Sequence, residues 1–226
     1  MPTLTRSGDV FVLNLGETEN RFHPDFVKAF GAALDEVAAA RGPRALVTAA
    51  NGKFWSNGLD LEWVQAHTEQ FAGYVSSVQE MFARVLELPL PTVAAIQGHC
   101  FAAGAMLALA HDFRDMRGDR GYFCLPEVDI KIPFTPGMTA LIQARLTPQV
   151  AHEVMTTGRR LGGEQAKAYG VVDATAGLDE VLPLAVERAG ELAPKAGPTL
   201  GLIKTRMYAS VIALLRDHAA NELVQS

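Results

Sequence analysis

Two short segments place glycine and other small residues where backbone amides can bind an oxyanion. In "NGKFWSNGLDLEW", Gly58 permits a tight or positive-φ turn, and Asp60 follows as a carboxylate suited to a helix start. In "GHCFAAGAM", residues 102–104 are small and open an apolar helix. The first amides of a helix have no partner within it and are free for a ligand. Two such amides aimed at one point would stabilise an enolate, by about 3 kcal/mol per donor.

An acid–base group is the second requirement of enolate chemistry, and Glu127 in "CLPEVDI" is the candidate. Its neighbours Phe123, Cys124, Leu125 and Val128 are apolar, and burial among them would raise its pKa towards that of a useful base. The alternative is an exposed or ion-paired glutamate at the start of a helix or loop.

Each of these features also has a purely structural explanation. Small residues at a helix start serve close packing or a tight turn, and this alternative stays open for either segment taken alone. Known phosphate-binding patterns are absent, since the chain has no G-x-x-x-x-G-K-[ST] and no G-x-G-x-x-G after a strand. It also has no G-x-S-x-G, so acyl hydrolysis by a serine nucleophile is unsupported.

The surrounding pattern predicts an α/β fold. "TRSGDVFVLNLG" indicates a hairpin, residues 23–41 have helical apolar spacing, and a second helix covers roughly 70–87. "RALVTAA" and "PTVAAIQG" read as buried strands, each followed by a glycine-containing turn and a helix, which predicts a largely parallel sheet. From Pro136 onward the pattern is almost entirely helical, broken by "GVVDATAG". We expect an α/β core over residues 1–173 and a helical C-terminal portion over 174–226.

Composition narrows the class of partner. The chain has 226 residues, 49% hydrophobic and 20% charged, and a formal net charge of -5, which disfavours a nucleic-acid backbone. Cys100 and Cys124 lie in apolar sequence without metal-ligand spacing, so we expect reduced core cysteines and no metal site. No signal-peptide pattern or membrane-length apolar run occurs, so we expect a cytoplasmic protein with no membrane partner.

Four segments taken together resemble one family. "KFWSNGLDL", "PTVAAIQGHCFAAGAMLALAHD", "LPEVDIKIPFTPGMTALIQARL" and "TTGRRLGGEQAKAYGVVD" resemble, in order and spacing, the enoyl-CoA hydratase/isomerase (crotonase) superfamily. The resemblance runs from about residue 10 to 173, and more loosely to the end. It implies a crotonase-type spiral of ββα units, with a helical C-terminal portion that contributes to oligomerisation and the pocket wall. It also implies an acyl-CoA substrate, no separate cofactor, and a homotrimer or hexamer.

The resemblance carries specific roles onto this sequence. The oxyanion donors would be the amides of Leu59 and Ala103, with Glu127 as acid/base. The further substrate-binding positions would be Lys53, Ser56, Gly58, Asp60, Gly104 and Met106. Among them Lys53 would approach the CoA phosphates, with a solvated loop charge as the alternative, and Gly104 together with Ala102 would leave the backbone bare for the thioester oxygen.

Met106 distinguishes between reactions of the family. Hydratases carry a first glutamate three residues after the oxyanion-hole position, where this chain has Met106, so one of two carboxylates remains. Moving the double bond of an enoyl thioester from position 3 to position 2 needs only one carboxylate. It takes a proton from C2 of the thioester and returns it at C4 while the two amides stabilise the dienolate. We therefore expect an isomerase, most similar to the compact Δ3,Δ2-enoyl-CoA isomerases. The alternatives are another crotonase-type enzyme (an enoyl-CoA hydratase, thioester lyase or decarboxylase) and a non-catalytic CoA-thioester-binding protein.

Other polar residues receive lesser roles. Asp129 is a candidate second acid, and Lys204 and Arg206 are candidate CoA-phosphate contacts, with surface charge as the equal alternative. The remaining conspicuous side chains are expected to be structural: His99, His111, Asp112, Asn20, Trp55 and Trp63.

Overall fold

The larger of two sheets has six strands, in a computed structural model that describes residues 1–221. The strand order is β1-β2-β3-β5-β7-β9, and the first two strands form the predicted antiparallel hairpin around Gly8, while every later pairing is parallel. The bounds are β1 Thr3–Ser7, β2 Val10–Asn14, β3 Ala45–Ala49, β5 Thr92–Ile96, β7 Phe113–Arg117 and β9 Ala174–Ala176.

A second sheet consists of three short parallel strands in the order β4-β6-β8. They are β4 Phe54–Ser56, β6 His99–Phe101 and β8 Phe123–Cys124. Each follows a strand of the large sheet and precedes a helix, so successive ββα units wind as the expected crotonase-type spiral. The sequence predicted only turns here, because two or three residues are too few to show strand alternation.

Helices make up most of the rest. They are α1 Pro24–Ala39, α2 Leu61–Ala66, α3 Phe71–Glu87, α4 Ala103–Ala110, α5 Glu127–Ile130, α6 Pro136–Arg145, α7 Pro148–Thr157, α8 Gly163–Ala168, α9 Leu178–Leu192, α10 Pro198–Met207 and α11 Ala209–Leu215. The predicted helices at 23–41 and 70–87 are confirmed as α1 and α3. Helix α1 buries the residues whose spacing predicted it, Phe26, Phe30, Ala33, Leu34 and Val37. Within residues 1–221, no helix is both long and apolar enough to cross a membrane.

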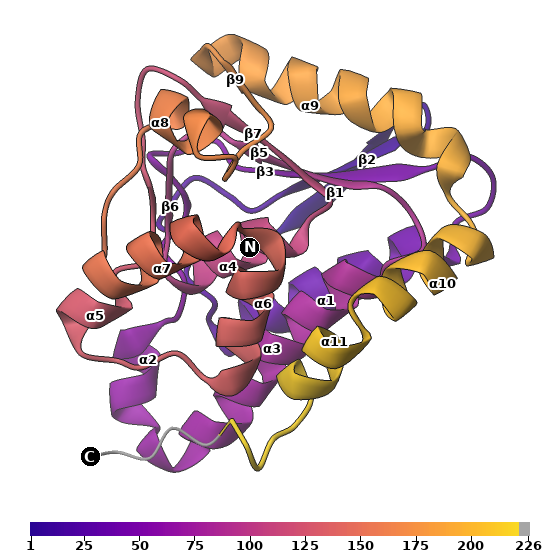
Figure 1. Cartoon of the computed structure of the whole chain (residues 1–226). Coiled ribbons are helices and arrows are strands. Elements are labelled where there is room, and N and C mark those ends of the chain that lie inside the picture. The colour runs from indigo at the N-terminus through magenta and orange to yellow at the C-terminus, as the bar shows by residue number, and fades with distance from the viewer. Residues whose placement is uncertain (222–226) are drawn as a thin grey trace.

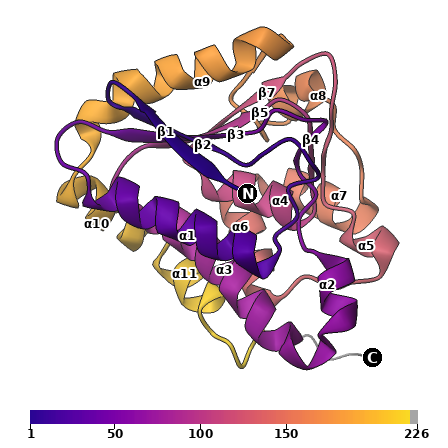
Figure 2. The ribbon, with the colours of Figure 1, turned by 180° about the vertical axis from the view of Figure 1, so that it is seen from behind.

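The sheet lies between two helical layers (Figure 1). Helix α9 covers one face and packs on β3, β5 and β7, and its own residues Ala185 and Ala189 are fully buried in this contact. Helices α1, α3 and α4 lie on the other side, as the reverse view in Figure 2 also shows. Helix α10 packs on α3, and α11 packs on both α3 and α6. Because β9 begins at Ala174 and pairs with β7, the sheet crosses the expected boundary at residue 173.

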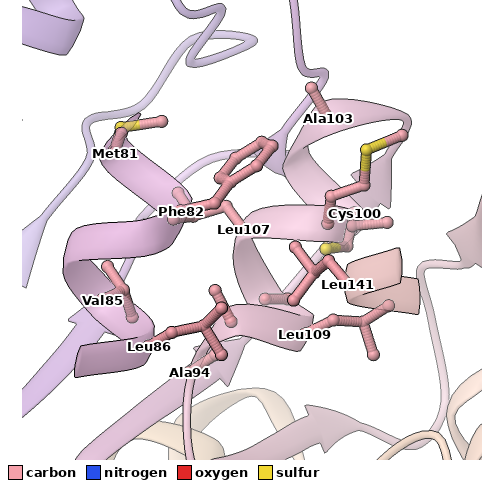
Figure 3. Packing of buried hydrophobic residues seen from close by; sticks show 14 of the residues in the cluster. Met81, Phe82, Val85, Leu86, Ala94, Cys100, Ala103, Leu107, Leu109 and Leu141 are labelled. Atoms are coloured by element: carbon pink, nitrogen blue, oxygen red, sulfur yellow. The ribbon is translucent and has the colours of Figure 1, made fainter. Parts of the chain in front are cut away.

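Helix α4 is buried on all sides. All eight of its residues are buried, and Figure 3 shows Phe82 and Leu86 of α3 beside Leu107 and Leu109 of α4. Close packing from every direction leaves such a helix little freedom to shift. The position of its first residue, Ala103, is therefore set by the core. Both cysteines are buried and free, as the sequence predicted.

Candidate active site

The turns after β4 and β6 meet because these two strands are neighbours in the small sheet. A Cβ atom added to Gly58 would lie 2.8 Å from the amide nitrogen of Ala103. Gly58 also has φ of +79°, which side-chain-bearing residues rarely adopt. Glycine is thus required at position 58 both for the backbone conformation and to leave the Ala103 amide uncovered.

Leu59 carries the one amide in the turn 57–60 that has no acceptor among the described residues. The other three amides of this turn all have acceptors. Asn57 N–H donates to the Glu19 carbonyl at 2.9 Å, and Gly58 N–H donates to the Ser56 hydroxyl at 3.1 Å. Asp60 N–H donates to the Tyr74 hydroxyl at 2.9 Å. A polar backbone group left without a partner in an otherwise paired turn is available for a ligand.

Ala103 presents the second unpaired amide. As the first residue of α4 it has no intrahelical partner, and within residues 1–221 its N–H meets no other acceptor. The preceding Ala102 has φ of 51° and ψ of -129°, a conformation that costs a non-glycine residue about 1–3 kcal/mol. Bonds from Ala102 N–H to Cys124 and from Met106 N–H to Ala102 hold this strained residue in place. Backbone strain is therefore located directly before the unpaired Ala103 amide.

Both amide-bearing residues line one cavity of about 320 Å³. Glu127 and Met106 line it too, and its volume falls in the range of small-ligand sites. The remaining apolar lining residues are Leu61, Val75, Phe101, Ala102, Pro126, Ile130, Ile132, Pro133 and Met138, and the remaining polar ones are Arg21, Asn57, Glu62 and Gln65. An apolar pocket with a few converging polar groups suits a thioester attached to a hydrocarbon chain.

Glu127 is the buried carboxyl group of this cavity. It begins the short helix α5 after Pro126, is 6% exposed, and its Oε2 atom has no hydrogen-bond partner among the described residues. Burial raises the pKa of Glu127 to about 7, against a smaller lowering by its own backbone N–H. A carboxyl group with this pKa can both accept and return a proton near neutral pH.

A family model described as Enoyl-CoA hydratase/isomerase matches residues 6–223. The chain belongs to this family. The crotonase fold and the acyl-CoA ligand class expected from the sequence follow from the membership.

Relatives and solved structures agree with this assignment. The chain is 36% identical to "Enoyl-CoA delta isomerase 3" of Arabidopsis thaliana, over 99% of this chain and 98% of that protein. It is 38% identical to "Enoyl-CoA delta isomerase 2, peroxisomal" of the same plant, over 95% of each chain. The apo structure of an Mtb enoyl-CoA isomerase superposes with a TM-score of 0.87 at 25% identity, covering 96% of this chain and 95% of the other. A Pseudomonas syringae protein of the family shares the fold, with a TM-score of 0.90 at 23% identity, over 99% and 98% of the two chains.

In this crotonase, several expected substrate-binding residues lie behind the cavity wall. Ser56 is fully buried, accepts the Gly58 N–H and donates to the Asn20 carbonyl at 2.9 Å. A Cβ atom on Gly104 would lie 2.7 Å from the Ser56 carbonyl oxygen, so Gly104 is bare to let α4 pack on β4. Gly104 is not part of the cavity lining, so its expected role beside the thioester oxygen stays a prediction, whereas the missing side chain of Gly58 is what leaves the Ala103 amide uncovered.

Lys53 and Asp60 also lie outside the cavity lining. The exposed Lys53 ammonium is 5.4 Å from the centre of the Phe54 ring, so its proposed contact with CoA stays a prediction. Asp60 caps α2 as the sequence predicted, and its carboxylate accepts the Trp63 N–H at 3.2 Å.

Asp129 does not join the site as a second acid. It is exposed on α5, next to Gly158 and outside the cavity lining. The side chain of α5 that enters the cavity with Glu127 is instead the apolar Ile130.

Lys204 is a structural residue and not a contact for CoA phosphate. It is 3% exposed, and its ammonium lies 2.9 Å from the carboxylate of Asp112, which also accepts the Thr92 N–H at 2.8 Å. The expected contact of Lys204 with a CoA phosphate is therefore wrong. The same expected contact for the exposed Arg206 stays a prediction.

Most of the other side chains that we expected to be structural are buried or bonded to neighbouring groups. His111 is fully buried between the Leu107 carbonyl and the Thr48 hydroxyl, and burial lowers its pKa to about 4. Asn20 donates to three backbone carbonyls from its amide group. Trp55 is fully buried, and Trp63 stacks on His67. His99 lies in a surface aromatic cluster, between Phe54 and Tyr122.

Sequence reasoning missed the polar part of the cavity lining. Arg21 there binds Glu62 at 3.0 Å and Glu19 at 2.6 Å. Arg21 and Glu62 come from segments about forty residues apart with no motif spacing, so no pattern in the sequence signalled that they would meet.

Proposed function

We propose that this crotonase is a Δ3,Δ2-enoyl-CoA isomerase that uses Glu127 as its single acid/base. The observation that supports this most strongly is one buried, protonatable carboxyl group sharing a cavity with two unpaired amides. Glu62 also borders the cavity, but its side chain is 81% exposed and paired with Arg21, which makes it a poor proton carrier. The names of the two plant relatives support the same reaction.

The proposed reaction is a proton transfer along one face of the substrate. The thioester oxygen accepts hydrogen bonds from the Leu59 and Ala103 amides, which stabilises negative charge and acidifies C2. The Glu127 carboxylate removes a C2 proton, and the electron pair delocalises into a dienolate that ends on the thioester oxygen. Glu127 then donates that proton to C4, so the double bond moves from C3–C4 to C2–C3 and the carboxylate is regenerated.

Met106 favours isomerisation over hydration. It is 1% exposed and lines the cavity at the place where a hydratase of the family carries its other glutamate. A thioether is at most a weak acceptor and donates nothing, so it cannot activate a water molecule. Proton transfer by Glu127 needs no such water.

The decisive experiment follows conversion of 3-hexenoyl-CoA to 2-hexenoyl-CoA by the absorbance of the conjugated thioester. The wild type should isomerise, Glu127→Gln should lose at least about 10³-fold in kcat, and hydration of 2-hexenoyl-CoA should be negligible. Asp129→Asn is the matched control, since it removes an exposed carboxylate two residues away on the same helix and should keep full activity. A wild type inert on 3-enoyl-CoA of several chain lengths would refute the isomerase proposal, and efficient hydration would favour the hydratase alternative.

We also propose that the protein forms a homotrimer or hexamer. Helix α10 exposes a run of large apolar side chains, with Leu202 and Ile203 each 51% exposed and Met207 62% exposed. Exposed apolar patches commonly mark contact surfaces between subunits. Light scattering after size-exclusion chromatography gives the mass directly, and a monomer would contradict the proposal. The cytoplasmic location remains a prediction, and two of the relatives are named as peroxisomal.

A further inference from the structure

Tyr74 of α3 binds the oxyanion turn from outside the cavity. Its side chain is 4% exposed and is not part of the cavity lining. The hydroxyl accepts the Asp60 N–H at 2.9 Å and donates to the Phe22 carbonyl at 2.8 Å. Both hydrogen-bonding functions of the phenol are therefore used on backbone groups next to the Leu59 donor.

Phe22 and Tyr74 together hold the two peptide planes that flank Leu59. The Phe22 N–H donates to the Gly58 carbonyl at 2.8 Å, and that carbonyl belongs to the same planar peptide as the Leu59 N–H. In a trans peptide the two groups point in opposite directions, so holding the carbonyl aims the N–H. On the other side of Leu59, Tyr74 holds the next peptide through the Asp60 N–H. The Leu59 amide is thus oriented from both sides.

Tyr74 also keeps the Asp60 N–H paired, so that this donor does not compete with the Leu59 N–H. Without the phenolic oxygen, the Asp60 N–H would have no partner beside the Leu59 N–H, and an unpaired donor in a partly buried site is unfavourable. The turn would then rotate towards another acceptor, such as water or the thioester oxygen itself. A misplacement of about 1 Å in a catalytic arrangement can cost about 100-fold in rate.

We propose that Tyr74 is a positioning residue that orients the Leu59 amide towards the thioester oxygen, an inference that rests on the proposed function. It contacts neither substrate nor Glu127, and it acts through the Asp60 amide. Removal of its hydroxyl should weaken stabilisation of the enolate much more than it weakens binding of acyl-CoA.

The test compares wild type with Tyr74→Phe, which keeps the ring and removes only the oxygen. Isomerisation of 3-hexenoyl-CoA should fall about 10- to 100-fold in kcat, and KM should change less than about threefold. Infrared spectra of bound hexanoyl-CoA, labelled with ¹³C at the thioester carbon, should show a smaller downward shift of the carbonyl stretch in the variant. Tyr169→Phe is the matched control, because it also removes a hydroxyl that binds a neighbour, the exposed Arg159, and should change neither quantity.

The outcomes separate this inference from the proposed function. An unchanged kcat and carbonyl shift in Tyr74→Phe, with Glu127→Gln inactive, would overturn the role of Tyr74 and leave the isomerase intact. If the wild type does not isomerise, the proposed function fails, and the carbonyl shift of bound hexanoyl-CoA still decides the role of Tyr74.

Hydrogen exchange provides a test if Tyr74→Phe does not fold. In the wild type the Asp60 amide should be protected, and the Leu59 amide should exchange freely until hexanoyl-CoA binds. A freely exchanging Asp60 amide, or a Leu59 amide protected without ligand, would refute the inference.

Discussion

Gly58 lies so close to Ala103 that a Cβ atom on the glycine would approach the alanine amide nitrogen to 2.8 Å. The Ala103 amide, the second of the two proposed oxyanion donors, is therefore accessible only because position 58 carries no side chain. Two turns separated by more than forty residues in sequence form one site through this contact.

Gly58→Ala should nearly abolish isomerisation. The new methyl group would cover the Ala103 amide, and the φ of +79° would strain the turn, so we expect at least about a 100-fold loss of kcat. Gly8→Ala is the matched control: Gly8 has φ of +60° with nothing within 4 Å of its Cβ position, so it introduces the backbone strain without an obstruction. Steady-state kinetics of both variants measure the difference, and equal losses would show that the loss does not come from covering the Ala103 amide.

The activity should depend on the ionisation of Glu127. Removal of the C2 proton requires the carboxylate, and burial raises its pKa to about 7. We expect kcat/KM for 3-hexenoyl-CoA to rise with pH through about 7 and to level off above it. A profile that is flat between pH 5 and 9 would contradict Glu127 as the base.

Stability should respond to pH in the opposite direction. The pKa of Glu127 is about 7 in the folded protein and near 4.5 when unfolded, so between these values the folded state binds more protons. Its contribution to the free energy of unfolding is therefore fully present below pH 4.5 and is lost as pH rises through about 7.

Glu127→Gln removes this pH dependence. Relative to the wild type, the stability of the variant should rise as the pH goes from about 4.5 to about 7, and above pH 7 the difference should level off at roughly 3 kcal/mol. Urea denaturation of both proteins at pH 5.5 and pH 8 measures the change. A stability difference that is the same at both pH values would show that Glu127 is not desolvated in the folded protein.

Lys204→Ala should destabilise the protein without weakening acyl-CoA binding. The change would leave Asp112 without its buried cationic partner, at a cost of about 3–5 kcal/mol. Arg206→Ala, on the same helix but exposed, should change the free energy of unfolding by less than about 0.5 kcal/mol. Urea denaturation gives both values. A raised KM in a Lys204→Ala enzyme of unchanged stability would restore the role in CoA binding that the structure argues against.

The sequence by itself determined the local parts of the site. Helical spacing predicted α1 and its buried face, Asp60 and the small residues at 102–104 predicted the starts of α2 and α4, and apolar neighbours predicted a buried Glu127. These features depend on residues within about one helical turn of each other, so the order of residue types along the chain is enough to indicate them.

Only the tertiary structure decided which of these parts meet. Strand β4 lies beside β6, so Gly58 faces Ala103, Ser56 supports the turn from within the core, and Gly104 makes room for Ser56. The pairing of Lys204 with Asp112 and the bond from Asp60 to Tyr74 likewise join distant segments. Such contacts have no periodicity in sequence, because they arise from how parallel strands are brought together by their connecting helices. Short motifs therefore indicated which residues are suited to the proposed chemistry. Packing and hydrogen bonds between segments far apart in the chain set the orientation of each amide.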